Sequence, residues 1–205
     1  MRFSLRSCVV ILSITLAAGL VYRAEAGEDK RFRASAASAY AHQVSEKVTV
    51  GAKPYLSADL VESAFGKKID FTRYGVVPVL VVVENKRDQA VDLRDLECSL
   101  VAADGRHATA VAPEDLPQLA LRGKAPPQTG VKIPMPVHVP KKNPLNTPEI
   151  ITRAFSAKML APGDSASGFV YFEAQPEEGD KLYLNGLRDA RTQKELLYFE
   201  FPFSQ

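Results

Sequence analysis

Val76-Val-Pro-Val-Leu-Val-Val-Val83 is the stretch that decides the fold of this 205-residue chain. The run holds no charged side chain, and its valines favour the extended backbone of a strand. Strands with one face in water alternate apolar and polar residues, whereas an uninterrupted apolar run indicates a strand covered on both faces. We therefore predict that residues 76–83 lie at the centre of a sheet.

Half-buried strands are predicted elsewhere, because apolar residues there alternate with polar ones. Leu96, Cys98 and Leu100 alternate with Glu97 and Ser99, so the Cys98 side chain is expected to face the core. In a strand at residues 195–203, one face would carry Leu197, Phe199, Phe201 and Phe203. Further strands are expected at residues 48–50, 107–111, 168–174 and 181–187.

Turn and helix signals separate these strands. Asp104-Gly105 is a pair preferred in two-residue hairpin turns, where both central residues need positive φ. Ser57 and Gly66 are suited to cap the two ends of a short helix. Together these features predict an all-β fold, an antiparallel immunoglobulin-like sandwich with one or two short helices. We expect a single sandwich domain at residues 47–205 with a proline-rich insertion at residues 116–148.

Residues 1–26 have the three parts of a secretory signal peptide. Two arginines begin the segment, Cys8 to Tyr22 carries no charge, and Ala24-Glu-Ala26 supplies small residues for cleavage. The apolar run is shorter than the roughly 20 residues that a helix needs to span a bilayer. We expect cleavage before Gly27 and an exported chain, periplasmic or extracellular. Membrane contact is expected only if the segment is kept as an uncleaved anchor.

Cleavage would change the charge of the chain. It removes three arginines and one glutamate, which lowers the formal net charge from +2 to zero. A neutral chain lacks the overall attraction that favours nucleic acid or an anionic membrane. Cys98 would be the one remaining cysteine, so the core must hold the fold without an intramolecular disulfide. No cofactor is expected.

Residues 27–46 are polar and rich in alanine and serine. Such a segment has few large apolar groups to bury, and ordering it costs conformational entropy. We therefore expect a polar, flexible arm, either loose or a frayed helix, ahead of the sandwich domain.

The segment Leu116–Pro148 is unusual in composition, with eight of the fourteen prolines, five cations and no carboxylate. Its cations form a local positive patch, and we predict a partner-binding surface made by Arg122, Lys124, Lys132, Lys141 and Lys142. Residues 131–139 alternate apolar side chains with lysine, proline and histidine, which favours an edge strand protected by its prolines. A polyproline II stretch is the structural alternative. The functional alternative is a segment that merely closes a sheet edge.

Gly163-Asp-Ser-Ala166 superficially matches the nucleophile loop of chymotrypsin-like proteases. Catalysis of that kind needs a histidine base held by an aspartate, together with an oxyanion hole. The histidine motif of those proteases is absent around each of the three histidines, and Ala166 stands where the glycine after the serine is required. A turn leading into a strand explains the residues better than a nucleophile at Ser165 does.

Met135 and His138, together with Met159, are candidate ligands for Cu(I), which prefers thioether and imidazole groups. A regular strand would point Met135 and His138 to opposite faces, which favours a core methionine and a surface histidine. No bound metal is expected.

Carboxylates cluster at two further places. Glu177, Glu178 and Asp180 offer oxygen ligands for calcium, but they lack the ordered spacing of a calcium loop, so we expect a solvated turn. Asp92 and Asp95 could form an acid–base pair, yet they lie beside an arginine, where ordinary ion pairing suffices.

LAPGDSASGFVYFEA at residues 160–174 and YGVVPVLVVVEN at residues 74–85 resemble signatures of uncharacterised bacterial envelope proteins. The resemblance covers residues 47–112 and 148–203 and implies an immunoglobulin-like sandwich outside the cytoplasm, without an activity. We therefore expect a non-catalytic binding or structural module of the bacterial envelope, whose partner is an unknown envelope protein or surface component. The alternatives are a periplasmic copper carrier that uses Met135 and His138, and a serine hydrolase that uses Ser165.

Overall fold

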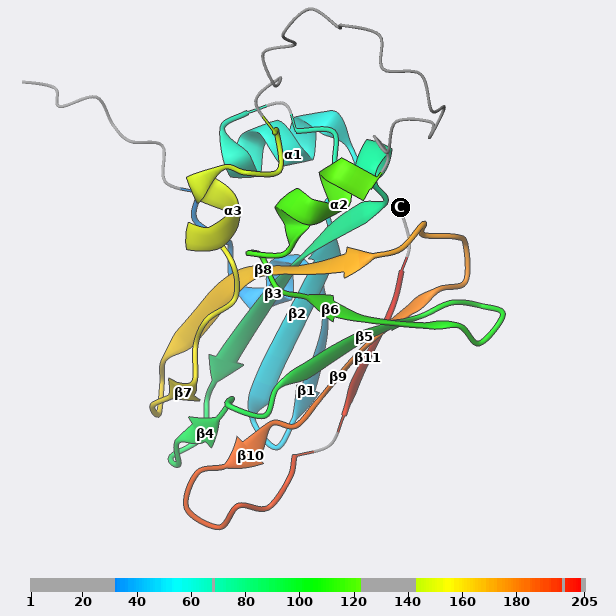
Figure 1. Ribbon diagram of the computed structural model, residues 1–205. Helices are drawn as coiled ribbons and strands as arrows, with labels where there is room; N and C mark the ends of the chain where they lie inside the picture. Colours follow the sequence, from blue (N-terminus) through cyan, green and yellow to red (C-terminus); the bar gives the residue numbers. More distant parts are fainter. Residues whose placement is uncertain (1–31, 68, 123–142, 197, 204–205) are drawn as a thin grey trace, which may run out of the picture. The chain divides into compact units, whose positions relative to one another are not determined.

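Strand β3 (Val76–Asn85) lies between β2 (Val48–Pro54) and β8 (Ser165–Glu173) near the middle of the main sheet. The computed structural model describes residues 32–67, 69–122, 143–196 and 198–203 (Figure 1). Residues 76–83 are all buried, which confirms the central, doubly covered strand predicted from the apolar run.

Pro78 sits in this central strand without breaking it. Its carbonyl accepts a hydrogen bond of 2.9 Å from the Tyr55 N–H, just beyond the last residue of β2. In an antiparallel pair the N–H and C=O of one residue face the same neighbour. The N–H that proline lacks would face Tyr55, beyond the last residue of β2, so every pair within β2 keeps its bonds.

The other strands are β1 (Ala41–Ser45), β4 (Val91–Asp92), β5 (Glu97–Val101), β6 (His107–Val111), β7 (Met159–Leu160), β9 (Lys181–Asn185), β10 (Arg188–Asp189) and β11 (Phe199–Pro202). Eight strands form a sheet in the order β1-β2-β3-β8-β6-β5-β9-β11, and three short ones form a sheet in the order β10-β4-β7. Adjacent strands in both sheets pair antiparallel. The larger sheet folds over, so that β5, β9 and β11 share a core with β2 and β3. The all-β sandwich is thus confirmed, whereas its immunoglobulin-like topology stays a prediction.

The two end strands of this sheet, β1 and β11, are bridged by one side chain. The Gln43 amide donates to the Glu200 carbonyl at 2.6 Å, and its oxygen accepts from the Glu200 N–H at 3.0 Å. The amide thus satisfies both backbone groups of Glu200, as a neighbouring strand would. The layers of the sandwich are joined by the β6–β8 pairing on one side and by Gln43 on the other.

Alternate residues of β3 belong to two separate cores. Val77, Val79, Val81 and Val83 lie between the layers of the sandwich, together with the buried phenylalanines of β11. On the opposite face, Leu80 belongs to a second core that includes residues of α1 (Ala58–Phe65), α2 (Leu116–Arg122) and α3 (Pro148–Thr152). Figure 1 shows these three helices gathered on the same side of the sheet.

The helix predicted between Ser57 and Gly66 is confirmed. Ser57 Oγ accepts a hydrogen bond of 3.3 Å from the Leu60 N–H, and Gly66 closes α1 with a φ of 65°. A three-residue turn, η2 (Thr72–Tyr74), then leads into β3. Among the described residues, no helix is long and apolar enough to cross a bilayer.

The proline-rich segment begins and ends in structure that we did not expect. Leu116, Leu119 and Ala120 are buried in α2, and Leu145 is buried just before α3, so both ends of the segment belong to the second core. An apolar i, i+3, i+4 spacing explains α2, and the proline-rich insertion predicted at residues 116–148 therefore does not hold at its two ends. The strand expected at residues 131–139 lies outside the described residues. The signal peptide expected at residues 1–26 lies outside them too.

The loose arm expected at residues 27–46 is not what the structure shows after residue 36. A short turn, η1 (Ala37–Ala39), precedes β1, and β1 pairs with β2 along its whole length. Four of the five β1 side chains are exposed. Backbone hydrogen bonding to β2 therefore orders β1, whose own side chains bury little, while Phe32, Ala37 and Tyr40 before it pack in the second core.

Two hairpin turns differ from the sequence pattern. Glu46 and Lys47 connect β1 to β2 with φ values of 45° and 64°, the positive φ that is usually left to glycine or asparagine. At the predicted Asp104-Gly105 turn, only Gly105 has positive φ, 86°. The Ala102 N–H donates to the Arg106 carbonyl at 2.8 Å, so this loop has three residues instead of the expected two.

Candidate functional site

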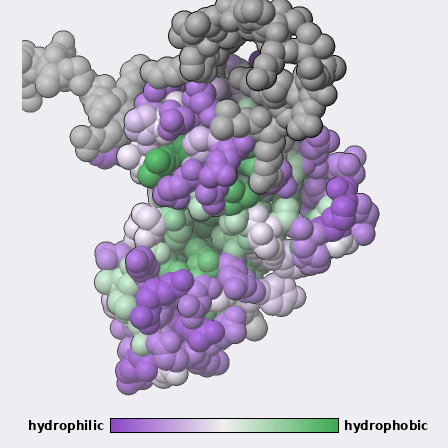
Figure 2. All heavy atoms as spheres, viewed as in Figure 1, coloured by the Kyte–Doolittle hydropathy of each residue, from purple (hydrophilic) through white to green (hydrophobic). Residues whose placement is uncertain are grey.

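An apolar cleft of about 640 Å³ opens beside β8, between residues 154–158 and the ends of β5 and β6. Figure 2 shows apolar surface exposed in a hollow between two hydrophilic regions. The described lining residues come from β5 and the turn before it, from the end of β6, from residues 154–158 and from β8. The cleft is therefore assembled from four segments that are distant in sequence.

The backbone beside β8 explains why the cleft exists. The Phe169 N–H donates to the Arg153 carbonyl at 2.8 Å, and the Phe155 N–H donates to the Phe169 carbonyl at 3.0 Å. Two residues further along β8, Tyr171 and Phe172 pair with β6 instead. The same edge of β8 is thus shared by two partners that leave in different directions.

Gly168 allows the first of these partners to come close. A Cβ atom at this position would lie 2.4 Å from the Cα of Phe155, far inside van der Waals contact. Residues 154–155 therefore lie directly against the β8 backbone. The following residues, up to Lys158, form one wall of the cleft.

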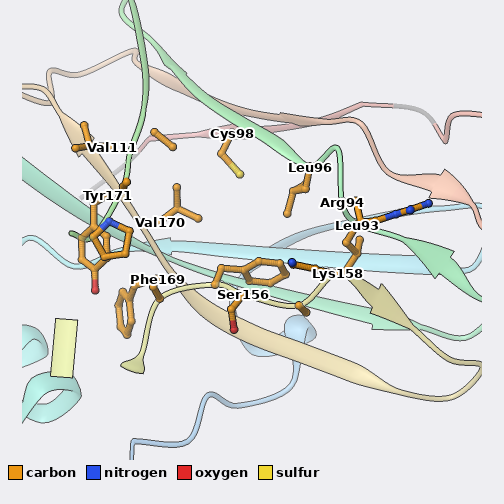
Figure 3. Close-up of a pocket in the computed structure, with 16 residues that line it drawn as sticks. Leu93, Arg94, Leu96, Cys98, Val111, Ser156, Lys158, Phe169, Val170 and Tyr171 are labelled. Atoms are coloured by element: carbon orange, nitrogen blue, oxygen red, sulfur yellow. The ribbon is translucent and has the colours of Figure 1, made fainter. Parts of the chain in front are cut away.

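The cleft walls are apolar and only partly covered. Leu96, Phe155, Ala157 and Val170 pack against the core between the layers but remain partly exposed. Cys98 is buried at the same wall, as its alternation in β5 predicted, and Figure 3 shows its side chain directed into the space beside Val170. The cleft is consequently an opening into the sandwich core.

Two cations lie at one end of the cleft, beside Leu93 (Figure 3). The Arg94 Nε donates to both oxygens of Asp92 at 3.0 and 3.1 Å, and its guanidinium extends away from the cleft. The Lys158 carbonyl accepts from the Leu93 N–H at 3.0 Å, while its ammonium group forms no ion pair with any residue that the structure describes. None of the described lining residues carries a carboxylate.

The cysteine and the tyrosine that line the cleft are held in their neutral forms. Burial raises the pKa of the Cys98 thiol to about 12, which keeps it protonated at neutral pH. Burial likewise raises the pKa of Tyr171, whose hydroxyl donates to the Ile150 carbonyl at 2.8 Å. Neither group is prepared to act as a nucleophile or a base near pH 7, so the arrangement suits binding.

The predicted partner-binding surface cannot be compared with this cleft, because four of its residues, Lys124, Lys132, Lys141 and Lys142, lie outside the described residues. Arg122 is the last residue of α2, and the placement of its side chain is likewise outside the description. This surface therefore stays a prediction.

Ser165 begins β8 as an exposed residue opposite Glu84. His42 is in β1, three strands away, or roughly 14 Å at the usual strand spacing. His107 is on β6 at the end remote from Ser165, because Val111 pairs with Tyr171, and the offset along the strands is roughly 30 Å. Neither histidine is placed to serve as a base for Ser165, and His138 lies outside the described residues.

In the described part of the chain, no group of three histidine, cysteine or acidic side chains could hold a metal ion. Met135 and His138 lie outside that part, and Met159 is exposed in β7. The expected solvated turn is wrong for Asp180. This side chain is 1% exposed and accepts from the Ala103 N–H at 3.1 Å and the Glu177 N–H at 2.9 Å, so it fastens two loops together.

Asp92 and Asp95 make ion pairs, as their neighbours suggested. The side-chain hydrogen bonds of Arg94, followed by its backbone N–H, lower the pKa of Asp92 to about 2. Asp95 lies 3.7 Å from a guanidinium nitrogen of Arg188. A carboxylate with so low a pKa is ionised throughout the physiological range and is not poised to transfer protons.

The fold and the site together define a class: an all-β sandwich with an apolar cleft opening into its core. No family model and no curated protein matches the chain. Solved structures with some likeness include ycdA, a proposed lipoprotein of Bacillus subtilis, with 13% identity and a TM-score of 0.40 over 80% of this chain. The chain spans 39% of that protein. MPT63, a secreted protein of Mycobacterium tuberculosis, has 12% identity and a TM-score of 0.33, covering 82% of this chain and 95% of MPT63. Likenesses this distant assign neither a family nor a function.

Sequence reasoning missed Phe155 and Lys158, the residues that form the cleft wall beside β8. They occur in the irregular stretch Arg153-Ala-Phe-Ser-Ala-Lys158, which has neither helical nor strand periodicity. The one usable signal was Gly168, a glycine inside an otherwise strand-like run, which often marks the close approach of another backbone.

Proposed function

We propose that this chain is an exported, non-catalytic binding module that holds an apolar ligand in the cleft beside β8. The observation that carries the proposal is the cleft itself, an opening of about 640 Å³ whose walls expose Leu96, Phe155 and Val170. Ligand sites in proteins have volumes of roughly 300–1,000 Å³ and mostly apolar walls. The cleft has both properties.

The chemistry of the lining supports binding over catalysis. Cys98 and Tyr171 are neutral, and the guanidinium of Arg94 is held by Asp92 outside the cleft. The remaining lining side chains that the structure describes are aliphatic, aromatic or small, apart from Ser156 and Lys158. A pair of groups with separated pKa values, as acid–base catalysis requires, does not occur among them.

A rough energy balance sets the affinity to look for. A ligand that buries ten methylene groups gains about 8 kcal/mol at about 0.8 kcal/mol for each group. Association costs at least about 4 kcal/mol in lost translational and rotational freedom. At most about 4 kcal/mol remains, which corresponds to a Kd of roughly 1 mM or weaker, so the calorimetric titration needs millimolar ligand.

The test is a calorimetric titration with nonionic alkyl glucosides of increasing chain length, kept below micelle formation. Ala110→Phe places a large side chain in the cleft and is expected to weaken binding at least tenfold. Ala161→Phe is the matched control, because Ala161 is exposed and is not part of the lining. If both variants are folded, as their melting curves would show, and bind with equal affinity, the ligand does not bind in the cleft.

Export is tested separately by intact mass. The protein recovered from an exporting host is expected to begin at Gly27. A chain that retains residues 1–26 and stays in the membrane fraction would show an anchored protein instead. The binding surface predicted at Arg122 and the four lysines that follow it remains a second proposal, for an envelope protein as partner.

A further inference from the structure

The ligand class of the cleft follows from the distribution of its charge. Among the described lining residues there are two cations and no carboxylate. Arg94 is neutralised by Asp92, which is itself nearly buried at 5% exposure. Lys158 is left at the same end of the cleft with its charge uncompensated by any described residue. The cleft therefore has an apolar body and one cationic end.

We infer that the cleft binds a single-chain amphiphile with an anionic head group, whose head lies at Lys158 and whose alkyl chain lies along Leu96, Phe155 and Val170. This inference rests on the proposed function. The occupant is an alkyl chain with a carboxylate, sulfate or phosphate head. The cleft volume suits one such chain, and the aliphatic and aromatic side chains of its walls suit an alkyl chain.

The charge preference has a definite size. An exposed ion pair contributes about 0.2–1 kcal/mol. This range corresponds to an affinity gain of roughly 1.5- to fivefold for an anionic head over a neutral one. A cationic head should bind more weakly than the neutral one by a similar factor. Because the pair is exposed to solvent, raising the ionic strength should reduce both differences.

The chain preference is independent of the charge. Each methylene group that enters the cleft should strengthen binding about fourfold, until the cleft is filled and the gain stops. Lys158 should determine how the affinity differs between anionic, neutral and cationic ligands of one chain length. The apolar walls should determine how steeply the affinity rises with chain length.

The experiment compares three probes of equal chain length by calorimetry at low salt: an alkyl sulfate, an alkyl glucoside and an alkyl trimethylammonium salt. Wild-type protein is expected to bind them in that order of decreasing affinity. In Lys158→Gln the three affinities should converge to within about twofold. Lys86→Gln removes the same charge from a lysine outside the cleft lining and should keep the wild-type order.

The outcomes separate the two proposals. If none of the probes binds, the proposed function and this inference both fail. If the glucoside binds but the sulfate gains nothing over it, or keeps its advantage in Lys158→Gln, the inference fails alone. An apolar peptide carboxylate that displaces the alkyl sulfate and binds more tightly than any alkyl chain would replace the amphiphile as the ligand.

Discussion

Replacing Gly168 by alanine is expected to destabilise the fold by roughly 2–4 kcal/mol and to distort the cleft. The new Cβ would lie 2.4 Å from the Cα of Phe155. Carbon atoms prefer a separation of about 3.5–4.0 Å, so residues 154–155 must move by about 1 Å. Such a shift would break the bonds of 2.8 and 3.0 Å that join Phe169 to Arg153 and Phe155. Two hydrogen bonds contribute about 2 kcal/mol, and overpacking adds about 1 kcal/mol or more.

The assay is equilibrium unfolding in urea, with Ser167→Ala as the control on the same strand. Ser167 is exposed, so its replacement should change the free energy of unfolding by no more than about 0.5 kcal/mol. The affinity of Gly168→Ala for an alkyl glucoside gives a second readout, because the displaced segment is a wall of the cleft. If Gly168→Ala unfolds within about 0.5 kcal/mol of the wild type, residues 154–155 do not lie against β8 in solution.

Three further changes test other parts of the structure. Gln43→Ala should cost about 1–2 kcal/mol in urea unfolding, because both hydrogen bonds to the Glu200 backbone are lost; an unchanged midpoint would mean that β1 and β11 are not bridged. Lys47→Gly should raise the melting temperature, because glycine adopts the φ of 64° found at Lys47 without steric strain. This result would be the opposite of the usual effect of a glycine within a strand, which destabilises by roughly 0.5–1 kcal/mol. Asp92→Asn should lower stability above about pH 4, the ordinary aspartate range, because Arg94 lowers the pKa of Asp92 to about 2 in the folded state. Its difference from the wild type should vanish as the pH falls through 2, and a constant difference from pH 7 to 2 would argue against the ion pair.

Short sequence patterns predicted the strands in which the burial of the side chains repeats regularly along the chain. The apolar run at residues 76–83 identified a central strand, because burial on both faces leaves no position for a polar residue. Phe199, Phe201 and Phe203 are buried while Tyr198 is 63% exposed, as their alternation predicted. In each case the burial of one residue is repeated two positions later, so a short window contains the signal.

Other parts were not predictable, because the interactions that order them are distant or lie in the backbone. Nearly every side chain of the strand Ala41–Ser45 is exposed. Its pairing to β2 depends on backbone hydrogen bonds, which form with almost any side chain. Its turn uses Glu46 and Lys47 at positive φ, against their intrinsic preference. The interactions of Arg87 with Asp189 at 2.8 Å and Glu46 at 3.9 Å bring together residues far apart in sequence near this turn. These ion pairs lie beside a turn that sequence propensity alone would reject.

The cleft arises from the way β8 changes partners along one edge. Phe169 bonds to residues 153 and 155, which run parallel to β8, while Tyr171 and Phe172 pair with the antiparallel β6. Two partners of opposite direction cannot continue past each other on one edge, so they must separate, and side chains between them lose part of their cover. Val170, between the two bonding positions, is accordingly left partly exposed. The opening is therefore built into the backbone, and substitutions such as Ala110→Phe can fill it without removing the pairing that creates it.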